Sequence, residues 1–237
     1  MKTVLLYSGG IDSYCLARIV KPDVLLYVDM GTKYTGHEIL RLKKPLGCEN
    51  SELVYESMEA LGRFEREEDG IIPARNAMLI LLAAQYGDEI IIGSTASDKA
   101  ADNCEPFTEL MNKMLTELWK PQWWLPDGIK KSVVTPLKGM TKSHIVSEYI
   151  RSGGDVATLR DCFSCYTPNK KGKECGNCPA CGQKWIALMN NCIVPVVDAS
   201  QWVRSHYWLK ALTTEWDRSE QDRNEVLNAY HNYQSAL

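Results

Sequence analysis

Ser8-Gly9-Gly10-Ile11-Asp12-Ser13 follows a short apolar run, Val4–Tyr7, and leads into a helical stretch, Ser13–Val20. Adjacent glycines let the backbone turn sharply and approach an anion, and the N-terminus of the following helix attracts negative charge. The string is neither a Walker A loop nor a Gly-x-Gly-x-x-Gly fingerprint. Alone it also fits a Gly-Gly turn capped by Asp12 or Ser13. Between a strand and a helix, it predicts a phosphate-binding loop.

Short aliphatic runs and helical stretches alternate around this loop. The predicted strands are Val4–Tyr7, Val24–Val28, Leu53–Tyr55, Glu89–Ile92 and Val133–Thr135. The predicted helices are Ser13–Val20, His37–Lys43, Arg75–Tyr86, Phe107–Leu118 and Lys142–Ile150, with stop signals at Gly87 and Gly153. The alternation predicts an α/β fold with a doubly wound, mostly parallel sheet. Ligands of such sheets bind outside the carboxyl ends of the strands.

The composition is that of an ordinary globular protein, with 45% hydrophobic and 24% charged residues in a chain of 237. This length suits one large α/β domain with a small appendage. The net charge of -3 gives no overall reason to bind nucleic acid, which favours a small-molecule substrate. Ser8 interrupts the apolar start, and no apolar run reaches the roughly 20 residues that cross a bilayer. We expect a cytoplasmic protein without membrane contact.

Nine cysteines are present, and five of them crowd between Cys162 and Cys181. Without a secretion signal, this clustering favours metal binding in a reducing compartment over disulfides. The two-residue gaps between Cys175, Cys178 and Cys181 fold a tight knuckle around one ion, and Cys165 or Cys162 supplies the fourth thiolate. Four sulfur ligands predict tetrahedral, structural zinc, with an iron–sulfur cluster as the alternative.

Further candidate residues lie at the ends of predicted elements. Arg75 and Asn76 open a helix, where they either bind phosphate or carboxylate or form a solvated helix start. Asp98 and Asp102 follow a strand and either bind magnesium or the N–H edge of a purine-like ring, or are ordinary loop aspartates. Lys142 either stabilises departing pyrophosphate or is a surface lysine. These residues alone do not decide between the readings.

Taken together, the segments resemble the N-type ATP pyrophosphatase (PP-loop) superfamily and, within it, the 7-cyano-7-deazaguanine synthase (QueC) family. The resemblance covers about residues 3–190. The matching segments, in the family's order, are Ser8–Ser13; Asp29-Met30-Gly31 with Glu38-Ile39; Pro73-Ala74-Arg75-Asn76; Gly93 with Asp98 and Asp102; Thr135-Pro136-Leu137 with Lys142; and Cys165-Tyr166 with the block Cys175–Cys181.

The resemblance implies an adenine nucleotide alpha hydrolase-like fold. A PP-loop ATP-binding domain is expected over residues 1–155, and a helical, zinc-binding region over residues 156–237. The implied cofactors are ATP, Mg²⁺ and Zn²⁺. The implied catalytic residues are Asp12, Arg75 and Lys142, and the implied substrate-binding residues are Asp98 and Asp102. The implied nucleotide-binding residues are Ser8, Gly9, Gly10, Asp12, Ser13, Asp29, Gly31, Arg75, Asn76 and Gly93. The implied zinc ligands are Cys165, in preference to Cys162, with Cys175, Cys178 and Cys181.

The activity implied by the resemblance is an ATP-dependent ligation in the queuosine pathway. It converts 7-carboxy-7-deazaguanine and ammonia to 7-cyano-7-deazaguanine through an acyl-adenylate and an amide, and releases AMP and pyrophosphate. A homodimer is also implied.

Two segments, Leu53–Pro73 and Ala96–Pro106, are shorter than in the family and keep two alternatives open. One is a relative that attaches a deazapurine to a protein or nucleic acid in a phage-defence or DNA-modification system. The other is a zinc module that binds nucleotides without catalysis, against which the intact loop with Asp12, Arg75 and Lys142 argues. The extension after Asn191 is expected to form core or subunit contacts through its tryptophans.

Overall fold

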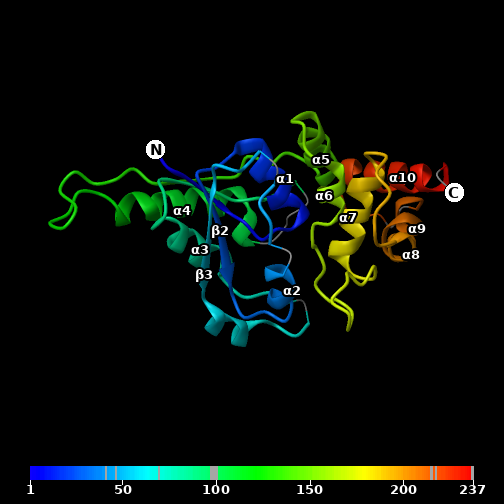
Figure 1. Cartoon of the computed structure of the whole chain (residues 1–237), viewed down its shortest axis with the longest axis horizontal. Helices are drawn as coiled ribbons and strands as arrows, with labels where there is room; N and C mark the ends of the chain where they lie inside the picture. Colours follow the sequence, from blue (N-terminus) through cyan, green and yellow to red (C-terminus); the bar gives the residue numbers. More distant parts are fainter. Residues whose placement is uncertain are drawn as a thin grey trace.

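The computed structural model describes residues 1–40, 42–45, 47–68, 70–96, 101–213, 216 and 218–235. A five-stranded parallel sheet in the order β3-β2-β1-β4-β5 lies at its centre (Figure 1). The strands are β1 (Thr3–Leu6), β2 (Val24–Asp29), β3 (Glu52–Ser57), β4 (Glu89–Ile91) and β5 (Ser132–Val134). The predicted α/β fold with a parallel sheet is confirmed, and each strand lies within two residues of its predicted bounds.

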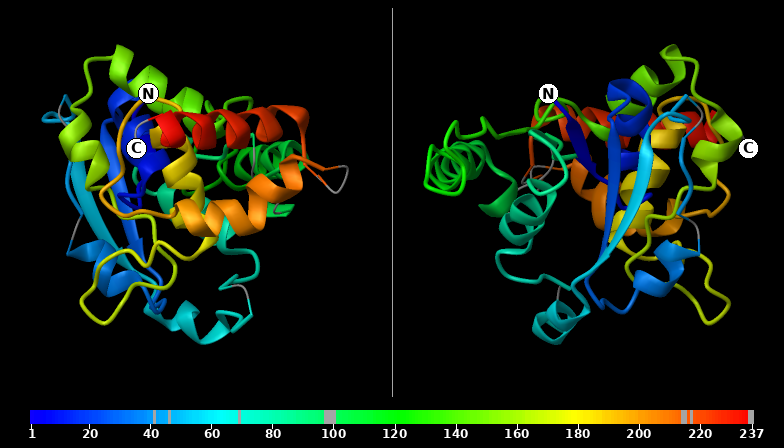
Figure 2. Two further views of the ribbon diagram at one scale, coloured as in Figure 1. Left: turned by 90° about the vertical axis from the view of Figure 1, so that its right-hand side faces the viewer. Right: turned by 60° about the vertical axis from the view of Figure 1, so that its left-hand side comes forward.

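Helices cover both faces of the sheet because the side chains of a strand alternate between its two faces (Figure 2). Leu5 and Ile91 pack with α1 (Ile11–Val20), α5 (Lys142–Arg151) and α7 (Pro179–Met189). The neighbouring residues Val4 and Ile90 belong to the opposite layer, with α3 (Arg75–Ala83) and α4 (Glu105–Leu118). Burial on both faces explains why the strands read as continuous apolar runs.

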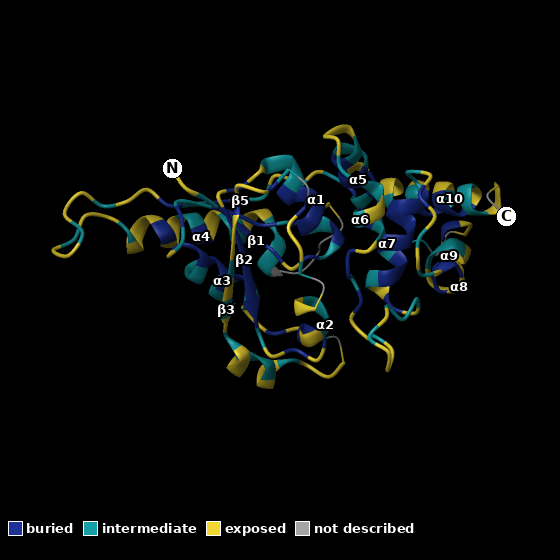
Figure 3. Cartoon of the chain, viewed as in Figure 1, coloured by how far each residue is buried: buried dark blue, intermediate teal, exposed yellow. Residues whose placement is uncertain are grey.

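The C-terminal region has a core of its own, built around aromatic side chains. Trp185 and Trp202 are buried in it, and Trp208 and Trp216 pack against it. The elements of this region are α6 (Val156–Arg160), α7, α8 (Ser200–Val203), a π-helical turn (Arg204–Trp208), α9 (Leu209–Ala211) and α10 (Glu220–Ser235). Figure 3 shows α7, largely buried, between α5 and α6 on one side and α8, α9 and α10 on the other. Helix α7 also gives Leu188 to the sheet core, so one helix joins the two cores.

Two predicted helices have wrong bounds. Helix α2 spans Thr35–Ile39 and not His37–Lys43. The carbonyl of Lys43 accepts a hydrogen bond from the Tyr7 hydroxyl, which holds this segment against the end of β1. Helix α3 ends at Ala83, before the predicted Tyr86. Two shorter helical segments are η1 (Glu59–Phe64) and η2 (Ala101–Asn103).

The early end of α3 follows from close packing at Gly87. The N–H groups of Gln85 and Tyr86 bond three residues back, which tightens the last turn. A β-carbon on Gly87 would lie 2.6 Å from the carbonyl oxygen of Lys2. The chain therefore turns beside β1 before it enters β4.

Candidate active site and metal centre

The predicted phosphate loop lies between β1 and α1. Gly9 has a φ of 71°, a left-handed conformation that favours glycine. The Ser8 hydroxyl accepts a hydrogen bond from Gly10 N at 3.3 Å and lies 3.2 Å from the Ser13 hydroxyl. Within the described part of the chain, the N–H groups of Asp12 and Ser13 have no acceptor. The loop thus offers backbone donors and a positive helix end to an anion.

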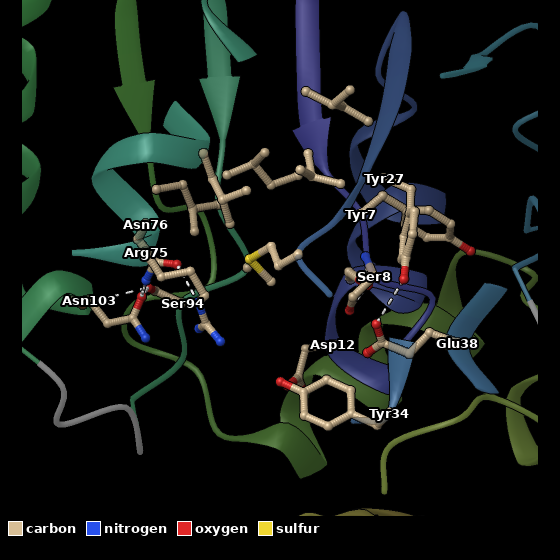
Figure 4. Close-up of a pocket in the computed structure, with 18 of the residues that line it drawn as sticks. Tyr7, Ser8, Asp12, Tyr27, Tyr34, Glu38, Arg75, Asn76, Ser94 and Asn103 are labelled. Atoms are coloured by element: carbon tan, nitrogen blue, oxygen red, sulfur yellow. Dashed lines mark hydrogen bonds between the residues drawn. The ribbon is translucent and has the colours of Figure 1, made fainter. Parts of the chain in front are cut away.

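A cavity of about 280 Å³ opens beside this loop at the carboxyl ends of β1, β2 and β4. Figure 4 shows Arg75, Asn76, Ser94 and Asn103 on one wall and Ser8, Tyr27 and Glu38 on the other, with Asp12 and Tyr34 between them. Further apolar lining comes from Leu6, Leu26, Val28, Met30, Leu79 and Ile92. An apolar wall beside a loop with free backbone donors can hold a flat apolar ring that is joined to an anionic group.

Lys142 is the first residue of α5, and it forms an ion pair with Asp12 at the start of α1. Their side chains are 16% and 27% exposed, so water screens the pair only in part. A second cavity of about 140 Å³ lies beside the pair, between the loop, the start of α5 and the cysteine segment. Ser8, Asp12 and Glu38 line both cavities.

Sequence reasoning assigned no role to Glu38, although Glu38 is the second carboxylate that lines both cavities. The Tyr27 hydroxyl donates a hydrogen bond to Glu38 Oε2 at 3.1 Å. Burial raises the pKa of Glu38 to about 7 because it disfavours the charged form. The rings of Tyr34 and Tyr166 lie nearby with their centroids 5.9 Å apart, and both line the larger cavity. A carboxylate beside two aromatic rings can hold a planar base with N–H groups on its edge.

The opposite wall carries Arg75 and Asn76. Asp102, which was predicted to bind substrate, contacts the start of α3. Asp102 Oδ2 accepts a hydrogen bond from Asn76 N at 3.2 Å, and its carbonyl accepts one from Asn76 Nδ2 at 3.0 Å. Asp102 therefore fixes the start of α3, and it is not among the residues that line the larger cavity. The other predicted substrate-binding residue, Asp98, lies outside the described residues.

Of the predicted residues that follow β2 and β4, one lines the cavity and two shape a turn beside it. Gly93 lines the cavity, and a β-carbon there would lie 4.0 Å from Ser13 N. Asp29 is buried, and its two oxygens accept hydrogen bonds from Gly31 N at 2.8 Å and the Tyr55 hydroxyl at 2.7 Å. A β-carbon on Gly31 would lie 2.4 Å from the carbonyl oxygen of Glu59. Asp29 and Gly31 thus shape the turn that presents Met30 to the cavity.

The four predicted metal-binding cysteines converge. The sulfur atoms of Cys165, Cys175, Cys178 and Cys181 all lie within 4.8 Å of one another. Cys162 points elsewhere, since its sulfur lies 3.8 Å from the Thr158 carbonyl oxygen in the sheet core. Backbone N–H groups of Cys175 and Asn177 donate to sulfurs of the cluster at 3.3 and 3.2 Å. Four such thiolates without histidine fit one tetrahedral metal ion.

Comparison with known protein families identifies the chain. The family model described as "Queuosine biosynthesis protein QueC" matches residues 35–191, which is more than half of the chain. The chain belongs to the QueC family. The match includes α3 with Arg75 and Asn76, the ion-pairing Lys142 and all four clustered cysteines.

The relatives within this family are similar at moderate identity. The 7-cyano-7-deazaguanine synthase of Geobacter sp. (strain M21) is 28% identical over 207 residues, covering 76% of this chain and 89% of that protein. The protein of the same name from Hydrogenovibrio crunogenus is 26% identical over 209 residues, covering 76% and 88%. The one from Stenotrophomonas maltophilia is 28% identical over 205 residues, covering 76% and 90%.

A solved structure, the U34-tRNA thiolase NcsA from Methanococcus maripaludis with its [4Fe-4S] cluster, aligns with 100% of this chain and 72% of its own. The TM-score is 0.40 at 12% sequence identity, too low a likeness to support an argument. Among the described helices, none is both long and apolar enough to span a bilayer.

Proposed function

We propose that this protein is an ATP-dependent carbon–nitrogen ligase that converts 7-carboxy-7-deazaguanine and ammonia to 7-cyano-7-deazaguanine. The observation that carries the proposal is a cavity in which a phosphate loop, a carboxylate, two aromatic rings and a guanidinium face one another, in a chain of the QueC family. The names of its relatives favour this activity over attachment of a deazapurine to a macromolecule. We further propose that it acts in the cytoplasm as a homodimer.

The larger cavity suits ATP. In this arrangement the triphosphate lies on the loop of Ser8 and Gly9, and the adenine lies along the apolar wall that includes Val28 and Met30. In this arrangement the amides of Asp12 and Ser13, at the start of α1, donate to phosphate oxygens. Gly93 leaves room beside the loop.

The deazapurine finds complementary groups on the side of the loop that faces the cysteine segment. A carboxylate can accept two N–H bonds from the edge of a guanine-like ring, and Glu38 has one oxygen on Tyr27 and its carboxylate directed into the cavity (Figure 4). Tyr34 and Tyr166 offer faces on which the ring can stack. Arg75, on the opposite wall, is placed to bind the 7-carboxylate and to hold it near the α-phosphate.

Two activations of the substrate follow. A carboxylate oxygen attacks the α-phosphorus, the α–β phosphoanhydride bond breaks, and pyrophosphate leaves. Ammonia then attacks the acyl carbon, AMP leaves, and a proton is lost, giving the amide. The amide oxygen attacks a second ATP in the same way, and loss of AMP and protons gives the nitrile. Lys142 stabilises the negative charge on the departing pyrophosphate, and Arg75 orients the acceptor.

Two metals fit residues of this chain. Asp12 offers a carboxylate beside the phosphate loop and would hold Mg²⁺ together with phosphate oxygens, lowering the charge of the triphosphate. The cluster of Cys165, Cys175, Cys178 and Cys181 would hold Zn²⁺, which supplies stability and no chemistry when all four positions are protein thiolates. Asp29 and Gly31 support the nucleotide site through the turn before Met30.

The products of one reaction test this proposal. With ATP, Mg²⁺, ammonium and 7-carboxy-7-deazaguanine, we expect AMP, pyrophosphate, a transient amide and the nitrile, with about two ATP used per nitrile because each activation consumes one. Mass spectrometry of nucleotides and bases measures all of these. ADP in place of AMP would contradict the phosphate-loop assignment. AMP without nitrile, in excess ammonium, would favour attachment to a macromolecule.

Replacing Glu38 with glutamine tests the base-binding arrangement. Because the amide supplies one acceptor where the carboxylate supplies two, we expect kcat/KM for 7-carboxy-7-deazaguanine to fall by about 10- to 100-fold, as for a hydrogen bond to a charged group. The KM for ATP should change little. Tyr27→Phe is the matched control, since it removes the internal partner of Glu38 and leaves both oxygens for the base. An equal fall in the two variants would mean that Glu38 supports the fold and does not read the base.

A further inference from the structure

A buried ion pair lies beneath the cysteine segment, outside the residues that the reaction uses. The side chains of Lys184, on α7, and Glu174 are 5% and 11% exposed, with Nζ and Oε2 3.0 Å apart. Lys184 also donates to the carbonyl oxygens of Arg160, at 3.1 Å, and of Cys162. All three ammonium donors are therefore used, which is what a buried cation requires.

Glu174 also fixes the position of a serine, Ser164. While its Oε2 binds Lys184, its Oε1 accepts a hydrogen bond from Ser164 N at 2.7 Å. The Ser164 hydroxyl in turn accepts one from Ile11 N at 3.1 Å, across 153 residues of sequence. Ile11 is the first residue of α1, and its N-cap, Gly10, has no side chain that could accept this bond.

From this chain of contacts we infer that Ser164, held by Glu174 and Lys184, is a positioning residue for the phosphate loop. The inference rests on the proposed nucleotide site. Ser164 fixes the first amide of α1, and thereby the direction of the next two amides, Asp12 and Ser13, toward the triphosphate. Ser164 precedes Cys165 of the cysteine cluster, so the same short segment joins the nucleotide site to the cluster.

The physical argument concerns preorganisation. A loop that must order on binding loses conformational entropy, and this loss weakens the affinity for the nucleotide. The helix N-terminus needs a partner for each of its first amides, and a glycine N-cap cannot supply one. The hydroxyl of Ser164 takes this role from outside the helix. The buried Lys184–Glu174 pair fixes the position of Ser164, because the Lys184 ammonium and both carboxylate oxygens of Glu174 each have hydrogen-bond partners.

Ser164→Ala tests the inference with a nucleotide that cannot be cleaved. We expect the dissociation constant of the α,β-methylene analogue of ATP, measured by calorimetry with Mg²⁺, to rise about fivefold, as for the loss of one hydrogen bond. The melting temperature without nucleotide should stay close to that of the unaltered chain. Unchanged affinity would overturn the inference. No binding of the analogue to the unaltered chain would overturn the nucleotide site and the inference with it.

Asn169→Ala is the matched control within the same segment. The Asn169 side chain accepts hydrogen bonds from Lys171 N at 2.9 Å and Lys173 N at 3.1 Å, and within the described residues it makes no hydrogen bond to the phosphate loop. Removing the Asn169 side chain loosens the segment but leaves the hydrogen bond between Ile11 and Ser164 in place. The affinity for the nucleotide analogue should therefore stay unchanged. An equal loss of affinity in Asn169→Ala would show that loosening alone accounts for the effect and would overturn the inference.

Glu174→Gln extends the test to the buried pair. This variant is expected to lower the melting temperature, because it leaves Lys184 with an uncompensated charge, and also to weaken the binding of the analogue. If Glu174 acts through Ser164, the affinity lost in the double variant is smaller than the sum of the two single losses. Additive losses, measured below the melting temperature of every variant, would separate the pair from the loop and overturn its part in the inference.

Discussion

Ser8→Ala combined with Asp12→Asn is expected to lower the rate of AMP formation by about 100- to 10,000-fold. The double change removes a hydroxyl placed beside the phosphates, where negative charge develops in the transition state. It also removes the carboxylate proposed to hold Mg²⁺. The fold should persist, because Ser8 is exposed at the cavity and Asp12 pairs only with Lys142 in the described structure. Single-turnover formation of AMP is the measurement, and circular dichroism checks the fold.

Asp127→Asn is the matched control for the loss of charge. Asp127 is an exposed carboxylate in the loop before β5 and lines neither cavity. This control should form AMP at the rate of the unaltered chain. A well-folded Ser8→Ala, Asp12→Asn variant with a normal rate would remove the loop from the reaction.

The features that the sequence predicted well are those made by residues close together in the chain. The loop over residues 8–13 needs only two glycines at a junction of strand and helix, and three of the four clustered cysteines are separated from one another by two residues. The parallel sheet follows in the same way, because each strand is a short apolar run. The residue types and their spacing over a few positions are enough to predict such features.

The features that the sequence did not predict depend on contacts between distant segments. Nothing in the local sequence of Glu38 distinguishes a cavity carboxylate from a surface one, and its hydrogen-bond partner, the Tyr27 hydroxyl, lies on β2. Asp102 was predicted to bind substrate, and its contact with the start of α3, 26 residues away, could not be predicted from its position after a strand. Ser164 accepts its hydrogen bond from Ile11 N across 153 residues of sequence. Tertiary packing decides the role of each of these residues.

The assignment of Cys165 as the fourth cysteine of the cluster was predicted, but not from its local sequence. Its spacing from Cys175 did not separate it from Cys162, and the resemblance to the QueC family favoured it. The structure agrees, since Cys165 joins the cluster while Cys162 lies in the sheet core. Burial raises the pKa of the Cys162 thiol to about 12, as expected for a thiol that serves as a small apolar side chain.

Cys178→Ser is expected to cause the largest loss of stability. Cys178 belongs to the cluster and is also the N-cap of α7, the helix that joins the two cores. Structural zinc contributes about 10–16 kcal/mol of apparent binding free energy in small zinc-finger peptides. If a third of this supports the fold here, the melting temperature falls by about 7–20 °C, at roughly 2–4 °C per kcal/mol for a chain of this size. Differential scanning fluorimetry measures the change, and metal analysis of the unaltered chain should give about one zinc per chain.

Cys192→Ser is the control, because Cys192 is exposed and lies outside the cluster. It should keep both the metal and the melting temperature. Iron with a visible chromophore in the purified protein would contradict zinc and favour an iron–sulfur cluster in the same four cysteines. An unchanged melting temperature after complete loss of the metal would mean that the second core, built on Trp185 and Trp202, holds α7 in place without it.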